Sequence, residues 1–140
     1  MFRKSVYLVA MGLILVSVAA VAQNAGKENA AVTSAEKWLR LIDEGNYAKS
    51  YTEAAAYFRN AVTQQKWEQS MQAVRKPLGK MVSRELKSKA YKTSLPGAPD
   101  GQYVEMHFGT SFASKKSAVE TVIFKMDAGG KWRVVGYFIR

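Results

Sequence analysis

The sequence predicts an α+β fold in which three N-terminal helices pack on one face of a curved four-stranded antiparallel meander sheet. Apolar residues recur every three or four positions between residues 34 and 78, as they do on amphipathic helices. From residue 80 onward they alternate with polar residues, and short turn segments separate the alternating runs. Helices followed by consecutive strands are typical of an α+β domain rather than of repeated βαβ units.

Each predicted helix has a start and a stop signal. The first covers residues 34–44: Thr33 and the glutamate three positions later have capping-box spacing, and the following glycine ends the helix. The second, residues 47–57, begins after an asparagine that can cap it. The third begins after Thr63 and ends at Pro77 and the glycine beyond it.

The predicted strands cover residues 80–92, 102–112, 117–126 and 131–140. The second strand places five side chains toward the helices, namely Val104, Met106, Phe108, Thr110 and Phe112. Prolines keep the segment Leu95–Gly101 out of the sheet, and Asp127–Gly130 is predicted to be a hairpin turn.

The last strand is apolar on both faces, which predicts a central strand or one covered on both sides. Strict alternation places Trp132, Val134 and Phe138 on one face and Val135, Tyr137 and Ile139 on the other. Gly136 between them suits a bend or a close backbone approach.

The N-terminus has the pattern of a secretory signal peptide. Arg3 and Lys4 precede the uncharged run Ser5–Ala22, which ends in the small-x-small sequence Ala-Val-Ala. We therefore predict a signal peptide over residues 1–22, a flexible leader over 23–33, a single domain over 34–140, and a periplasmic or secreted protein that meets the membrane only during export. An uncleaved membrane anchor is the alternative, because the run approaches the length of a spanning helix.

The composition limits the chemistry of the domain. The chain has no cysteine, so packing rather than disulfides must stabilise it, and thiolate catalysis and thiolate metal sites are excluded. With a single histidine, a histidine-based zinc site would need several carboxylates. The sequence predicts no metal site and no cofactor.

The predicted mature chain is basic, with 19 Lys and Arg against 11 Asp and Glu once Arg3 and Lys4 are removed. Seven basic residues gather within eighteen positions: Arg75, Lys76, Lys80, Arg84, Lys87, Lys89 and Lys92. Such a patch can bind an anionic polymer. We favour a solvated face or a protected strand edge, and we do not expect nucleic acid as a partner.

Several short motifs occur in a distinctive order along the domain. They include Trp38-Leu-x-Leu-Ile-Asp-x-Gly-x-Tyr47, Arg75-x-Pro-Leu-Gly79, Leu95-Pro-Gly-Ala-Pro-Asp-Gly-x-Tyr-Val104 and Trp132-Arg-Val-x-Gly-Tyr-Phe-Ile139. The ensemble resembles the domain-of-unknown-function family 4019, small exported proteins of Gram-negative bacteria. The resemblance implies a cone-like fold similar to nuclear transport factor two or cystatin, a shape that serves enzymes and binding domains alike. It implies no activity and no catalytic residue.

Two residues are candidates for acid–base chemistry. Glu120 is in phase with the inward residues of its strand, and a buried carboxylate needs a partner such as Arg75 or Arg84. We favour a structural ion pair; a pocket acid is the alternative. Asp43, at the end of the first helix, also needs a compensating contact, or else caps the helix end in a turn. His107 is a candidate general base because histidine as a residue type can exchange protons near neutral pH, but its phase turns it away from the helices.

Aromatic side chains give two further candidate sites. Five of them, together with Glu120, are candidates to line a pocket for a small molecule: Trp38, Tyr47, Tyr51, Trp67 and Trp132. We favour a packed core for these residues. The outer sheet face predicts an interface for a homodimer or for an envelope protein partner, formed by Tyr103, His107, Ile123, Val135, Tyr137 and Ile139.

These features favour a non-catalytic ligand- or protein-binding module of the cell envelope. The alternatives are a small cone-fold enzyme that works through Glu120 or His107, and a binder of anionic polymer through the basic residues 75–92. An enzyme would need a polar, water-accessible cavity around Glu120 or His107.

Overall fold

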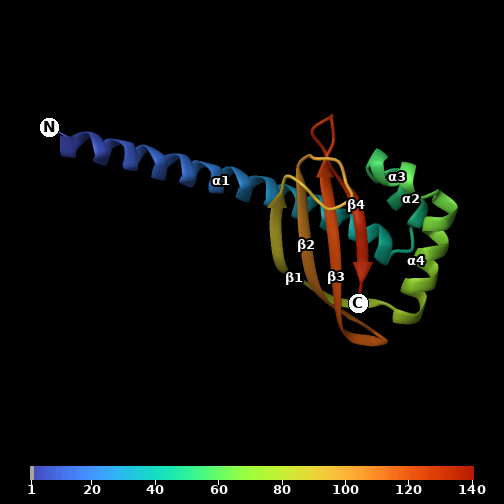
Figure 1. Ribbon diagram of the computed structural model, residues 1–140. Helices are drawn as coiled ribbons and strands as arrows, with labels where there is room; N and C mark the ends of the chain where they lie inside the picture. The colour runs from blue at the N-terminus through green and yellow to red at the C-terminus, as the bar shows by residue number, and fades with distance from the viewer. Residues whose placement is uncertain (1) are drawn as a thin grey trace.

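The computed structural model describes the backbone of residues 2–140 and the side chains of residues 18–140. The elements are α1 (Phe2–Asp43), α2 (Tyr47–Thr52), α3 (Ala56–Ala61), α4 (Gln64–Leu78), β1 (Met81–Lys92), β2 (Tyr103–Phe112), β3 (Lys115–Met126) and β4 (Trp132–Ile139). The predicted α+β fold is confirmed: helices pack on one side of a four-stranded antiparallel meander (Figure 1). The sheet is not strongly curled.

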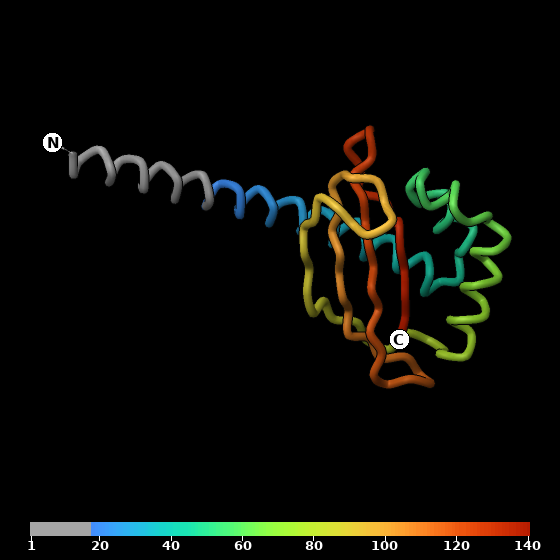
Figure 2. Tube along the Cα trace, viewed as in Figure 1, coloured from blue at the N-terminus to red at the C-terminus, as the bar shows by residue number. Residues whose placement is uncertain are grey.

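Helix α1 crosses behind the four strands and extends beyond the sheet (Figure 1). Residues 23–33, predicted to be a flexible leader, belong to this helix, and Ala31 is fully buried. Thr33 forms no capping box, because it lies inside the helix and its hydroxyl donates to the Asn29 carbonyl at 3.1 Å. Figure 2 traces this helix from residue 18 into the body of the domain.

The predicted signal peptide falls mainly on residues 1–17, whose side chains lie outside the part that the structure describes. Across the described part of the chain, no helix has both the length and the hydropathy that crossing a membrane requires.

The predicted second helix is two short helices, α2 and α3. Ala55 between them has an extended backbone (φ −60°, ψ 148°), and its N–H donates to the Val134 carbonyl of β4 at 3.0 Å. A continuous helix would leave that edge carbonyl without this donor. The third predicted helix is confirmed as α4, with the Thr63 hydroxyl accepting from the Lys66 N–H and Gly79 at positive φ.

The strands follow one another in space as they do in sequence, in the order β1-β2-β3-β4. The predicted turns separate them, including Asp127–Gly130, where Gly130 adopts the positive φ of 78° that a hairpin turn needs. β4 is an edge strand, so the prediction of a central position for it is wrong. Its inner face is buried against the helices, whereas Phe138 on its other face is exposed.

A bulge in β4 reverses the faces predicted for its last residues. Ile123 pairs with Gly136 but Phe124 pairs with Val134, so β4 holds one extra residue at this point. Beyond the bulge, Tyr137 turns toward the helices and is 7% exposed. Phe138 points to the opposite face and is 62% exposed.

Aromatic rings fill the space between the helices and the sheet. Trp38 of α1 stands edge-on to Phe124 and Tyr137, with ring centroids 6.2 and 5.4 Å apart, and lies 6.1 Å from Trp67 of α4. Edge-to-face pairs of this kind add specific attraction to the burial of apolar area. The centre of the fold is therefore a packed core.

Candidate functional site

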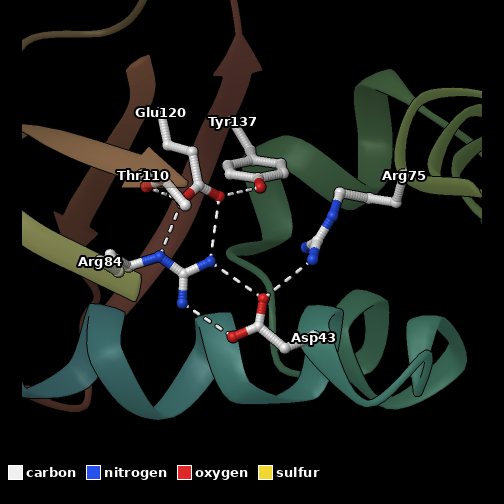
Figure 3. A network of polar contacts seen from close by, with 6 residues as sticks. All are labelled: Asp43, Arg75, Arg84, Thr110, Glu120 and Tyr137. Carbon is white, nitrogen blue, oxygen red and sulfur yellow. Dashed lines mark hydrogen bonds and ion pairs between the residues drawn. The ribbon is translucent and has the colours of Figure 1, made fainter. Parts of the chain in front are cut away.

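Six side chains form a polar cluster at one end of this core (Figure 3). Each comes from a different element: Asp43 from α1, Arg75 from α4, Arg84 from β1, Thr110 from β2, Glu120 from β3 and Tyr137 from β4. We call these six residues the charge cluster. It ties together both layers of the domain.

Glu120 is fully buried and accepts four hydrogen bonds. Arg84 donates from Nε to Oε1 at 2.7 Å and from Nη2 to Oε2 at 3.2 Å. Thr110 donates its hydroxyl to Oε1 at 2.5 Å, and the Tyr137 hydroxyl donates to Oε2. Both carboxylate oxygens are thus occupied, and the guanidinium compensates the buried negative charge.

Asp43 lies on the helix side of the same guanidinium. Arg84 donates to its two carboxylate oxygens at 2.7 and 2.9 Å, and Arg75 donates to Oδ1 at 3.0 Å. A carboxylate at a helix C-terminus is unfavourable by itself, and two cations offset that cost. The compensating contact expected for Asp43 is present. Of the two arginines suggested as partners of Glu120, Arg84 binds it and Arg75 binds Asp43.

Arg75 is the one member of the charge cluster with buried donors that lack a partner. Its side chain is 5% exposed, and its Nε and Nη1 atoms donate to no described residue. The face of its guanidinium lies over the Phe112 ring, with Cζ 4.8 Å from the ring centroid. This cation–π contact offsets part of the desolvation of the charge.

Within the charge cluster, the surroundings of Arg84 favour its charged form and those of Tyr137 its neutral form. Burial would lower the pKa of Arg84, but hydrogen bonds and charge attraction from Asp43 and Glu120 raise it instead. Burial and the neighbouring Glu120 charge raise the pKa of the Tyr137 hydroxyl well above its ordinary value. Two arginines balance two carboxylates, so the arrangement is suited to holding elements together rather than to moving protons.

Most predicted pocket residues belong to the core. The indole N–H groups of Trp38 and Trp67 donate to the Ser50 carbonyl and hydroxyl at 2.9 and 3.0 Å. Tyr51 donates its hydroxyl to the Val62 carbonyl at 2.7 Å. Tyr47 borders a separate surface hollow of about 600 Å³ beside Arg75, and Trp132 borders another groove. The structure does not bring these residues together with Glu120 in one cavity.

The outer face of the sheet is bare of helices (Figure 1). Three residues of the predicted interface do not lie on this face. Tyr103 is fully buried because the loop before β2 folds over it, and its hydroxyl donates to the Pro99 carbonyl at 2.5 Å. The bulge in β4 turns Tyr137 and Ile139 toward the core. Phe138 takes their place on the outer face, a residue that strict alternation assigns to the inside.

His107 stays on the outer face, as its phase predicts. It is partly buried, with Nδ1 3.1 Å from the Thr121 hydroxyl and Nε2 3.4 Å from a Glu105 carboxylate oxygen. Burial alone would raise the pKa of Glu105, but hydrogen bonds from Lys92 and His107 lower it. These contacts link neighbouring strands and lie on the opposite side of the sheet from Glu120.

The seven basic residues do not form one surface patch. Arg75 and Arg84 are buried in the charge cluster. Lys87 and Lys92 pair with Glu85 and Glu105 at 3.0 and 3.2 Å. Lys89 donates to Asn29 of α1, and Lys76 and Lys80 line the hollow next to Arg75. The alternation of side chains along β1, together with two register shifts in its pairing with β2, sends consecutive charges to different faces.

One family model matches residues 34–137, described as a protein of unknown function (DUF4019). The chain belongs to this family. The match begins inside α1 and ends at Tyr137, so it spans every residue of the charge cluster. No curated protein shows significant similarity to the chain. Family membership confirms the resemblance found in the sequence and brings no established function with it.

Proposed function

We propose that this protein is a non-catalytic binding module of the cell envelope that acts as a homodimer through the outer face of its sheet. The carrying observation is Phe138, which is 62% exposed on a sheet face that no described helix covers (Figure 1). Its cross-strand partner is Thr121 of β3, and the half-buried side chains Val119 and Ile123 lie on either side of that residue on the same face. We call Phe138, Val119 and Ile123 the outer patch. Contiguous apolar side chains on a bare face favour an interface.

A second copy is the occupant that this surface fits best. An interface with twofold symmetry must be complementary to itself. The outer patch has an apolar centre, and residues of both signs border it, with Glu105 paired across from Ile123 and Lys125 two positions along the same strand. Two such faces can pack sheet against sheet, about 10 Å apart, with each acidic group near a basic group of the other copy.

The inner face gives no support to an enzyme built on Glu120. Each Glu120 oxygen already accepts two hydrogen bonds, and its side chain is inaccessible. A general acid or base must reach the substrate and exchange a proton with it. The scattered basic residues likewise give little support to an anionic-polymer binder, since such a partner is best held by neighbouring, unpaired cations.

Export rests on the sequence. Arg3 and Lys4, the uncharged run that follows and the Ala-Val-Ala site before Gln23 support cleavage after Ala22 and a periplasmic or secreted location. The absence of cysteine fits a domain whose stability comes from its core and its charge cluster rather than from disulfides.

Native mass spectrometry of the protein isolated from its own envelope fraction tests both parts of this proposal. We expect a denatured mass that begins at Gln23 and a native mass of two such chains with nothing added. A monomer at micromolar concentration would contradict the dimer. A denatured mass that includes residues 1–22 would contradict cleavage and leave the dimer standing.

A further inference from the structure

A hollow of about 450 Å³ opens on the outer face of the sheet, over β1, β2 and the beginning of β3. Gly109 of β2 contributes no side chain to it, and the stem of Lys87 covers this position, with Cε 2.8 Å from where a Cβ would stand. Val119 of the outer patch, Lys116 and three serines also line the hollow. We call it the glycine hollow. It lies on the same face as Phe138, on the other side of β3.

Phe138 and Gly109 flank β3 at neighbouring positions of the outer face. β3 lies between β2 and β4 in the sheet. Gly109 is paired with Val119, and Phe138 is paired with Thr121, the next outward residue of β3. The Phe138 ring lies over Gly136, with Cε2 3.2 Å from where a Cβ of that glycine would stand, and is largely exposed. The outer face therefore has a protruding ring on one side of β3 and a hollow on the other.

This arrangement is complementary to itself under a twofold axis. When two copies pack sheet against sheet, an axis that runs along β3 between them places β4 of each copy opposite β2 of the other. Phe138 then faces β2 of the other copy one outward position from Gly109, and the rotation of about 30° between packed sheets can bring the ring over the hollow. A face with a protruding ring and no hollow would instead set the two rings against each other.

The lining of the glycine hollow suits an aromatic ring. Val119 and the methylene stem of Lys87 offer apolar contacts. Lys87 and Lys116 also supply ammonium groups, and a cation beside the face of an aromatic ring is attracted to it. The Lys87 side chain can move to admit the ring, because it is 60% exposed and its ion pair is with the exposed Glu85.

We propose that Phe138 of each copy enters the glycine hollow of the other copy. The inference rests on the proposed dimer and specifies which residues meet in it. Burial of the ring removes apolar area from water, and the symmetry of the pair makes this contact twice.

Sedimentation equilibrium of Gly109→Leu tests the contact, because the new side chain fills the hollow while Phe138 is unchanged. The atoms nearest to an added Cβ all belong to the flexible stem of Lys87, so the fold should persist. We expect dimerisation at least about tenfold weaker than in the wild type. Ala90→Leu is the matched control: Ala90 is exposed on the same face of edge strand β1, outside the area that the second copy covers, and its dimer should be unchanged.

The outcomes separate this contact from the dimer itself. A wild-type monomer would contradict the dimer and the contact together. A wild-type dimer with equal strength in Gly109→Leu and Ala90→Leu would overturn the contact and leave the dimer standing.

Photo-crosslinking gives a second test that leaves the hollow intact. The photoreactive amino acid p-benzoylphenylalanine, placed at position 138, keeps an aromatic ring there. After irradiation we expect a covalent dimer in which the linked peptide of the other copy contains Lys87 or Gly109. A covalent dimer linked through residues 132–140 of both copies would mean that the two rings meet each other, and would overturn the proposal.

Discussion

The two faces of the sheet differ in the kind of unfavourable group that they carry: buried charges on the inner face and an exposed apolar ring on the outer face. The inner face buries two carboxylates and two arginines, and pairs each charge with another (Figure 3). The outer face leaves Phe138 in water with no covering helix. A buried charge that is fully paired contributes to the architecture, whereas an apolar ring that nothing covers is available to a partner. The inner face therefore contributes to stability, and the outer face is the one at which we propose binding.

Glu120→Gln gives the largest expected effect on the inner face. The substitution keeps the shape of the side chain but removes the negative charge that Arg84 faces, and breaking a buried ion pair costs about 3–5 kcal/mol. Urea unfolding should show a free energy of unfolding lower by this amount. Glu85→Gln is the matched control, because its pair with Lys87 is exposed, and it should change the free energy by less than about 1 kcal/mol. Equal effects of the two variants would refute the structural role.

Tyr137→Phe should have a smaller effect that depends on pH. Near neutral pH the loss of one hydrogen bond to a charged group costs about 1.5–3 kcal/mol. The pKa of Tyr137 is raised in the folded protein, so the unfolded chain releases this proton first, near pH 10. Stability from this group is complete below pH 10 and falls as the pH rises above it. Unfolding curves between pH 8 and 11 should therefore show a shallower alkaline loss for the variant, and an identical slope would contradict the buried, protonated hydroxyl.

Much of the fold follows from local sequence patterns. The period-two alternation and the turn residues place all four strands close to their observed bounds, and the buried face of β2 is confirmed residue by residue. Thr63 and Gly79 bound α4 as predicted. These features depend on neighbours in the sequence, so a single chain is enough to predict them.

The sequence-based predictions are wrong where a contact with a residue far along the chain determines the local structure. The break at Ala55 exists because β4 has an edge carbonyl to satisfy, and the reversed face of β4 follows from a bulge whose register is set by β3. The capping pattern at Thr33 does not begin a helix, because the residues before it already belong to α1.

The candidate site shows the same division between local and distant information. The positions of Asp43 and Glu120 in the sequence indicate that both carboxylates need compensating contacts. The sequence also names Arg75 and Arg84 as possible partners of Glu120. Their meeting in one cluster is not evident, because Asp43 and Arg84 are 41 residues apart and come together only when α1 packs on the sheet.

Sedimentation equilibrium of the wild type, Phe138→Asp and Val82→Asp is the most direct test of the division between the two faces. Val82 is 68% exposed on edge strand β1 and provides a matched control. Neither change touches the charge cluster, so both variants should unfold within about 0.5 kcal/mol of the wild-type monomer. We expect a dimer for the wild type and for Val82→Asp, and a monomer for Phe138→Asp over the same concentrations. A wild-type monomer, or a Phe138→Asp dimer of unchanged strength, would contradict the assignment of binding to the outer face.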